Sequence, residues 1–107
     1  MAFFSNEIIL NDAQTSYADI MIFDMYSFKG VEINYMVKRA DKTEMGNIFL
    51  TFDRTTLTSK LITISHFDVT GINFSSDIIN NNVRLRYTST SNGIKPVFKY
   101  DLTGFSL

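Results

Sequence analysis

The sequence predicts an all-β protein, a single antiparallel β-sandwich of about eight strands with a jelly-roll-like arrangement. Apolar and polar residues alternate with a period of two in several segments. Turn-forming residues separate these segments at intervals of roughly eight to twelve residues, as in sandwiches and barrels. Ile, Phe, Tyr and Thr are plentiful and Ala is scarce, which favours strands over helices. We expect one domain, 1–107, with one hydrophobic core.

The clearest strand is VEINYMVK, residues 31–38, where Val31, Ile33 and Tyr35 alternate with polar residues. This pattern predicts one buried and one exposed face. The segment at 18–25 could form a strand or a short helical turn. In chain order, the other predicted strands are 3–10, 18–25, 46–52, 60–67, 71–76, 82–89 and 94–102. The predicted turns are RADKTEMG, DRTT, SDIINNN and TSNG.

The alternation also predicts which side chains enter the core. These residues share the apolar face of their strands. They are Ile33, Tyr35, Leu50, Phe74, Leu85, Tyr87 and Phe98.

The last two predicted strands, 82–89 and 94–102, are expected to form a hairpin. Partners across an antiparallel pair point to the same face, which allows a register with Thr88 opposite Gly93. Pro96 cannot donate a ladder hydrogen bond, so its strand should lie at an edge or carry a bulge. Four basic residues would then share the outer face: Arg84, Arg86, Lys95 and Lys99.

This basic group resembles a nucleic-acid groove, but its geometry argues against one. Single-strand binders present aromatic rings on the same surface as the charges. Here the period of two places Tyr87, Phe98 and Tyr100 on the opposite face. The net charge of −1 provides no general attraction for nucleic acid or an anionic membrane. We therefore expect a solvated or intersubunit charged face, with no nucleic-acid or membrane partner.

Two predicted strands are apolar on both faces. One sandwich of this size covers only one face of each sheet. The second face needs another cover, and the simplest candidate is another copy of the chain. The apolar interface candidates are Met21, Phe23, Ile62 and Ile64.

No motif predicts catalysis or a cofactor. The chain has no Cys, and His66 is its single histidine, so a serine triad or a histidine metal site would have to be built around it. Ser65 points to the opposite face of the same strand, and Asp68 shares the face of His66 only if the strand continues. The carboxylates mostly flank turns, where Asp is a common structural residue. No segment has the length and apolarity of a membrane helix. We expect a non-enzymatic, soluble protein made in the cytoplasm.

Two runs, FDMYSFKGVEINYMVKRADKTEMGNIFLTFD and DVTGINFSSDIINNNVRLRYTSTSNGIKPVFKYDL, resemble a β-sandwich module of tail-fibre, head-fibre and other structural proteins of tailed bacteriophages. The resemblance covers about 80 of 107 residues. Pro96 and the Phe105 that stands in place of a tryptophan depart from the family pattern. The matching positions are Tyr26, Ile33, Tyr35, Val37, Arg39, Gly46, Gly71, Ile72, Phe74, Leu85, Tyr87, Thr88, Ser89 and Thr90.

The resemblance implies a structural role on a virion, commonly as a trimer, and no catalytic residues. We expect a small separate subunit, a fibre, knob or decoration module, that docks on other virion proteins. The alternative is a carbohydrate-binding module for host-surface glycans, with exposed Tyr or Phe rings stacking on sugars near the loops. An enzyme is a second alternative.

Overall fold

The computed structural model describes residues 4–67 and 69–106, with side chains at all of these positions except 64–67 and 106. These residues form an antiparallel β-sandwich, as the sequence predicts. The strands are β1 (Asn6–Ile9), β2 (Ala18–Asp24), β3 (Phe28–Arg39), β4 (Lys42–Asp53), β5 (Thr58–Phe67), β6 (Ile72–Ile79), β7 (Asn82–Ser89) and β8 (Val97–Ser106).

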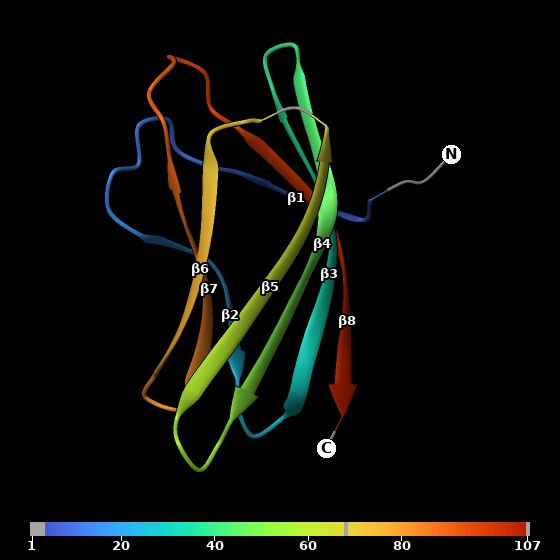
Figure 1. Ribbon diagram of the computed structural model, residues 1–107, viewed down its shortest axis with the longest axis vertical. Helices are drawn as coiled ribbons and strands as arrows, with labels where there is room; N and C mark the ends of the chain where they lie inside the picture. Colours follow the sequence, from blue (N-terminus) through green and yellow to red (C-terminus); the bar gives the residue numbers. More distant parts are fainter. Residues whose placement is uncertain (1–3, 68, 107) are drawn as a thin grey trace.

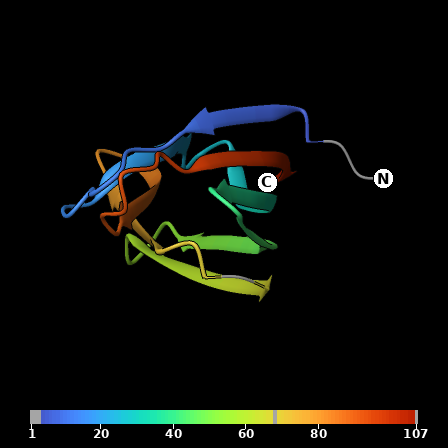
Figure 2. The ribbon, with the colours of Figure 1, turned by 90° about the horizontal axis from the view of Figure 1, so that it is seen from above.

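The strands form two packed sheets (Figure 1). The larger sheet has five strands in the order β1-β8-β3-β4-β5, and the smaller has three in the order β2-β7-β6. The view from above separates the two layers (Figure 2). β1 pairs with β8 and β2 pairs with β7, as in a jelly roll, whereas β3, β4 and β5 form a consecutive meander.

The core lies between the two sheets and confirms the predicted faces. Six of the seven predicted core residues are buried, and the seventh, Phe74, packs against them. Phe98 stacks on Tyr35 with ring centroids 5.5 Å apart, and Phe74 meets Tyr35 edge-on at 5.3 Å. The buried apolar residues are Leu10, Phe23, Met25, Val31, Ile33, Tyr35, Val37, Ile48, Leu50, Val83, Leu85, Tyr87 and Phe98.

All eight predicted strands are present, but some ends differ. β6 continues through most of SDIINNN, and only Asn80 and Asn81 lie between it and β7. Both have positive φ, 52° and 66°, which Asn tolerates because its short side chain can bond its own backbone. The last strand begins at Val97 and not at Ile94 as predicted, because residues 94–96 still lie in the crossover between the two sheets.

The predicted hairpin of β7 with β8 is wrong. β7 lies between β2 and β6 in the small sheet, and β8 lies between β1 and β3 in the large one. The segment 90–96 crosses from one sheet to the other, and the carbonyl of buried Pro96 accepts a hydrogen bond from Leu10 N at 2.8 Å. The two strands do share an inward apolar face, but they turn it toward the core from different sheets.

Candidate functional site

A cluster around the buried Arg39 joins three loops at one end of the sandwich. Arg39 ends β3 and is 2% exposed. Its Nε donates to Ile94 O at 2.9 Å, and its Nη1 donates to Thr70 O at 2.9 Å and Thr90 Oγ1 at 3.0 Å. Its Nη2 donates to Thr90 O at 2.7 Å and Asp12 Oδ1 at 2.6 Å. We call these five residues the Arg39 cluster.

Asp12 extends this cluster to the crossover between the sheets. Its two carboxylate oxygens accept from Asn92 N at 2.9 Å and Gly93 N at 3.1 Å. These backbone donors, with Asn92 first, and the Arg39 guanidinium hold the pKa of Asp12 below its usual range, although partial burial opposes the shift. The Arg39 cluster thus ties down loop backbone, and its polar groups are used inside the protein.

A buried acid lies next to the cluster. Glu44 on β4 is 9% exposed and accepts from Tyr35 Oη at 2.7 Å and from Thr70 Oγ1 at 3.0 Å. Each of its two oxygens therefore has a hydroxyl donor within the protein. This arrangement secures the segment before β6 to the large sheet and does not present a carboxylate to a substrate.

The outer face of the small sheet carries an ionic network. Arg84 Nε donates to Asp77 Oδ1 at 2.6 Å, and Arg86 Nε donates to Asp19 Oδ1 at 2.9 Å. Each arginine also lies within 3.8 Å of the other carboxylate. The hydrogen bond from Arg84 lowers the pKa of Asp77. Two aspartates thus neutralise the two arginines, and this face is not a basic patch.

The predicted outer face shared by four basic residues is also wrong, because β7 and β8 belong to different sheets. Lys99 lies on β8 in the large sheet, with its Nζ 3.9 Å from Glu7 Oε1 on β1. Lys95 is exposed in the crossover between the sheets. The arginines of β7 and these lysines do not form one surface.

The apolar interface candidates have different outcomes. Phe23 is 8% exposed in the core and Met21 packs against the core, so these two predictions are corrected. On β2 the exposed apolar residue is Ile22, which is 55% exposed. Ile62 lies on the outer face of β5 and is 47% exposed. The side chain of Ile64 lies outside the described residues, and its backbone pairs with Asn47.

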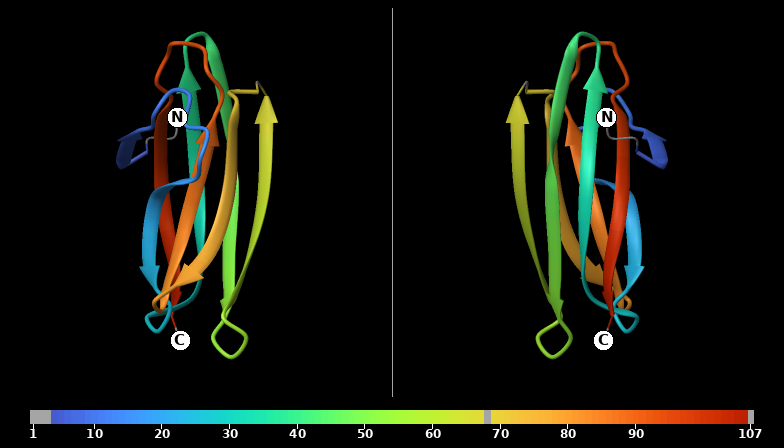
Figure 3. Two further views of the ribbon diagram at one scale, coloured as in Figure 1. Left: turned by 90° about the vertical axis from the view of Figure 1, so that its left-hand side faces the viewer. Right: turned by 90° about the vertical axis from the view of Figure 1, so that its right-hand side faces the viewer.

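β5 is the longest strand at the end of either sheet. Its ten residues pair with β4 on one side, and no strand follows it in the sheet order. Figure 3 shows it outermost, on the opposite side of the large sheet from β1. The other end strands, β1, β2 and β6, have four, seven and eight residues. A long edge of this kind offers free backbone donors and acceptors to another strand.

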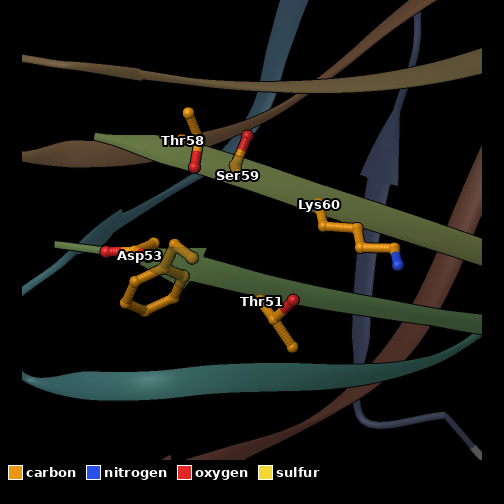
Figure 4. A pocket seen from close by; sticks show the side chains of 6 residues that line it. Thr51, Asp53, Thr58, Ser59 and Lys60 are labelled. Atoms are coloured by element: carbon orange, nitrogen blue, oxygen red, sulfur yellow. The ribbon is translucent and has the colours of Figure 1, made fainter. Parts of the chain in front are cut away.

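An open hollow of about 210 Å³ lies beside the turn between β4 and β5 (Figure 4). We call it the β4–β5 hollow. Three hydroxyl side chains, one carboxylate, one ammonium group and one aromatic ring contribute to its lining. The residues are Thr51, Phe52, Asp53, Thr58, Ser59 and Lys60.

The described residues do not test a catalytic arrangement around His66. Its backbone lies in β5 opposite Met45, whereas its side chain and those of Ser65 and Asp68 lie outside the described residues. Within the described residues, no group of three or more His, Cys, Asp or Glu side chains could hold a metal ion. The described chain also has no helix that could cross a membrane.

The sequence interpretation missed the Arg39 cluster as a structural centre. Arg39 is in phase with Ile33, Tyr35 and Val37, which places its side chain on the core side of β3. The sequence therefore did contain a signal, a charged residue on the core side of a strand end. A buried arginine needs several hydrogen-bond acceptors, so this position indicates a polar cluster around it. No sequence signal identifies Asp12 as its partner.

No protein-family model matches the chain, and a search of curated proteins finds no match.

Proposed function

We propose that the chain is a non-enzymatic structural component of a bacteriophage virion, a trimeric fibre, knob or decoration subunit that docks on other virion proteins. The sequence resemblance to virion β-sandwich modules supports the virion role. The exposed β5 edge, with Ile62 beside it, supports assembly. Function then resides in subunit packing and not in a reaction.

The edge of β5 is the observation that carries this proposal. It has no Pro and no bulge in its pairing with β4, and Lys60 is the single charge among its described side chains. Soluble proteins usually protect long edges with charges, bulges or short strands. The small sheet follows that rule, because β2 has a bulge between Asp19 and Met21 and β6 carries Asp77.

Side chains next to this edge favour a protein partner over solvent. Ile62 is directly opposite Phe49, so the outer face of the large sheet has an apolar pair at its margin. A partner strand along β5 would satisfy the backbone groups and cover Ile62. If β5 of each copy meets a different surface of the next copy and the rotation at each contact closes on itself, the repeated contact forms a ring, as a trimer requires.

Native mass spectrometry and light scattering of the purified chain test the proposal. We expect a species of three times the 12.3 kDa chain that Ile62→Lys shifts to monomer. Tyr26→Lys is the matched control, because Tyr26 is 57% exposed in the turn between β2 and β3 and is not part of the β5 edge. A wild-type monomer at every concentration up to the millimolar range would contradict self-assembly, and an Ile62→Lys trimer would contradict the β5 contact.

A further inference from the structure

The β4–β5 hollow has a dipolar arrangement of side chains. Thr51 is paired with Lys60 and Asp53 with Thr58 in the β4–β5 register. Directly opposite residues of an antiparallel pair point to the same face, so these four side chains leave the sheet on one side. Figure 4 shows Asp53 and Lys60 at opposite ends of the group. The hollow thus has an acceptor end and a cationic end.

Both charged groups have unused bonding capacity. Asp53 Oδ1 accepts from Thr55 N at 2.7 Å and Thr56 N at 3.2 Å, which fixes the orientation of the carboxylate. Its Oδ2 accepts no hydrogen bond from the described residues. The ammonium of Lys60 has no carboxylate partner among them within 4.0 Å. An acid and a base on adjacent strands therefore remain separate, with open space between them.

The hydroxyl groups between them add donors and acceptors. Thr58 Oγ1 is 2.7 Å from Thr56 Oγ1. Ser59 points to the other face of β5, where its Oγ is 2.8 Å from Ser76 Oγ on the facing sheet. A hydroxyl has one donor and two acceptor positions, so Thr58 can make a further hydrogen bond. Thr51 contributes another hydroxyl.

The turn beside the hollow is braced in one conformation. Arg54 donates from Nη2 to the carbonyl of Phe28 and lies over the Phe52 ring at 5.6 Å from its centroid. Leu57 has a φ of 56°, a conformation that a branched side chain adopts only when its surroundings hold it there. A site formed before binding loses less entropy when a ligand arrives.

We propose that the β4–β5 hollow binds one acidic sugar unit. The volume of about 210 Å³ is smaller than the roughly 300–1,000 Å³ of sites for larger ligands and suits a single ring. Sugar hydroxyls donate to Asp53 Oδ2 and exchange hydrogen bonds with the hydroxyls of Thr51 and Thr58, while the sugar carboxylate pairs with Lys60. A neutral sugar cannot form the ion pair with Lys60, and a simple anion such as acetate cannot form the hydrogen bonds with Asp53 and the hydroxyl groups. This binding site lies on the same face of β5 as Ile62 and uses side chains that the assembly proposal does not invoke.

Titration of the ¹⁵N-labelled chain with sodium glucuronate tests the site by NMR. We expect amide shifts concentrated at 51–53 and 58–60, with glucose and acetate each binding more weakly than glucuronate. Lys60→Gln should weaken glucuronate binding about fivefold, the scale of one solvent-exposed ion pair. Thr51→Val should weaken it without changing the charge.

Lys38→Gln is the matched control, because Lys38 is an exposed lysine of β3 in the same sheet. It should bind glucuronate as the wild type does. The proposal is overturned if glucuronate shifts no amides at the hollow, if acetate gives the same shifts at the same concentrations, or if Lys60→Gln and Lys38→Gln bind equally. The readout is amide shifts at the hollow and not the mass of the species, so failure of the site is distinguishable from failure of the assembly proposal.

Discussion

Arg39 Nη2 and Asp12 Oδ1 lie 2.6 Å apart and join the end of β3 to the loop that follows β1. The arginine side chain is 1% exposed and the aspartate side chain 24%. The guanidinium also donates to three loop carbonyls, those of Thr70, Thr90 and Ile94. One side chain therefore fixes three loops that the sheets alone would leave without a common support.

Replacing Arg39 with methionine should strongly destabilise the fold. The methionine keeps part of the apolar stem but leaves three buried or half-buried carbonyls without their donor. We expect a loss of at least about 3 kcal/mol in the free energy of unfolding, measured by urea denaturation. Lys38→Met, an exposed change one position earlier, should change it little. Equal effects of the two changes would contradict the role assigned to Arg39.

Stability should fall in acid because of Asp12. Its pKa is lowered in the folded state, so the unfolded chain binds the proton more readily. The stabilisation is complete above the unfolded pKa, about pH 4, and is lost as pH falls through the lower folded value. Asp12→Asn should therefore be less stable than wild type at pH 7 and show a smaller further loss between pH 4 and 2. The free energy of unfolding of both proteins is measured by urea denaturation. An equal loss in Asp12→Asn and wild type between pH 4 and 2 would disprove the role assigned to Asp12.

Gly71→Ala should damage the Arg39 cluster. Gly71 has a φ of 79°, and a Cβ added there would collide with Thr90 Oγ1 and lie 3.2 Å from Arg39 Nη1. Gly93→Ala is the control that has the backbone strain without the collision. Gly93 has a φ of 80°, and no atom lies within 4 Å of an added Cβ. We expect about 1–2 kcal/mol for Gly93→Ala from backbone strain and a clearly larger loss for Gly71→Ala. Thermal and urea unfolding of both variants measure the two losses of stability. Equal losses would mean that the structure relieves the collision at Gly71 and would contradict the prediction.

Phe98→Ala should remove a central part of the core. Phe98 is fully buried and its ring contacts Tyr35, Phe74 and Tyr100 at centroid distances of 5.5–5.9 Å. Such a truncation costs about 3–5 kcal/mol. The control is Phe105→Ala on the same strand, where the ring is 47% exposed and the cost should be much smaller. Similar unfolding midpoints for the two variants would contradict the position of Phe98 in the core.

Strand positions and faces were predictable because burial on one side of a strand leaves a period of two in the sequence. Ile33, Tyr35 and Leu85 all lie on the predicted side. The same rule does not say whether two consecutive strands lie side by side or face each other across the core. This explains the incorrect hairpin of β7 and β8, for which Tyr87 and Phe98 point inward in both arrangements.

The candidate sites were less predictable because they depend on pairing over long distances in the chain. Arg84 and Arg86 appeared as a free basic group, and their neutralisation by Asp19 follows only from the β2–β7 pairing. Phe23 and Ile22 alternate on one strand, and their sequence does not state which of the two faces the second sheet. The β4–β5 hollow depends on the turn conformation and on the register that sets Asp53 beside Thr58.

The Arg39 cluster also has a consequence for the rate at which the protein unfolds. Its acceptors lie 27 to 55 positions from Arg39 in the chain, so both sheets must be in place before it can close. Interactions that form after the folding transition state leave the folding rate nearly unchanged and slow unfolding. We expect the cluster to form late in folding and to give the folded chain a long lifetime, a property that the proposed role in an assembled particle would require.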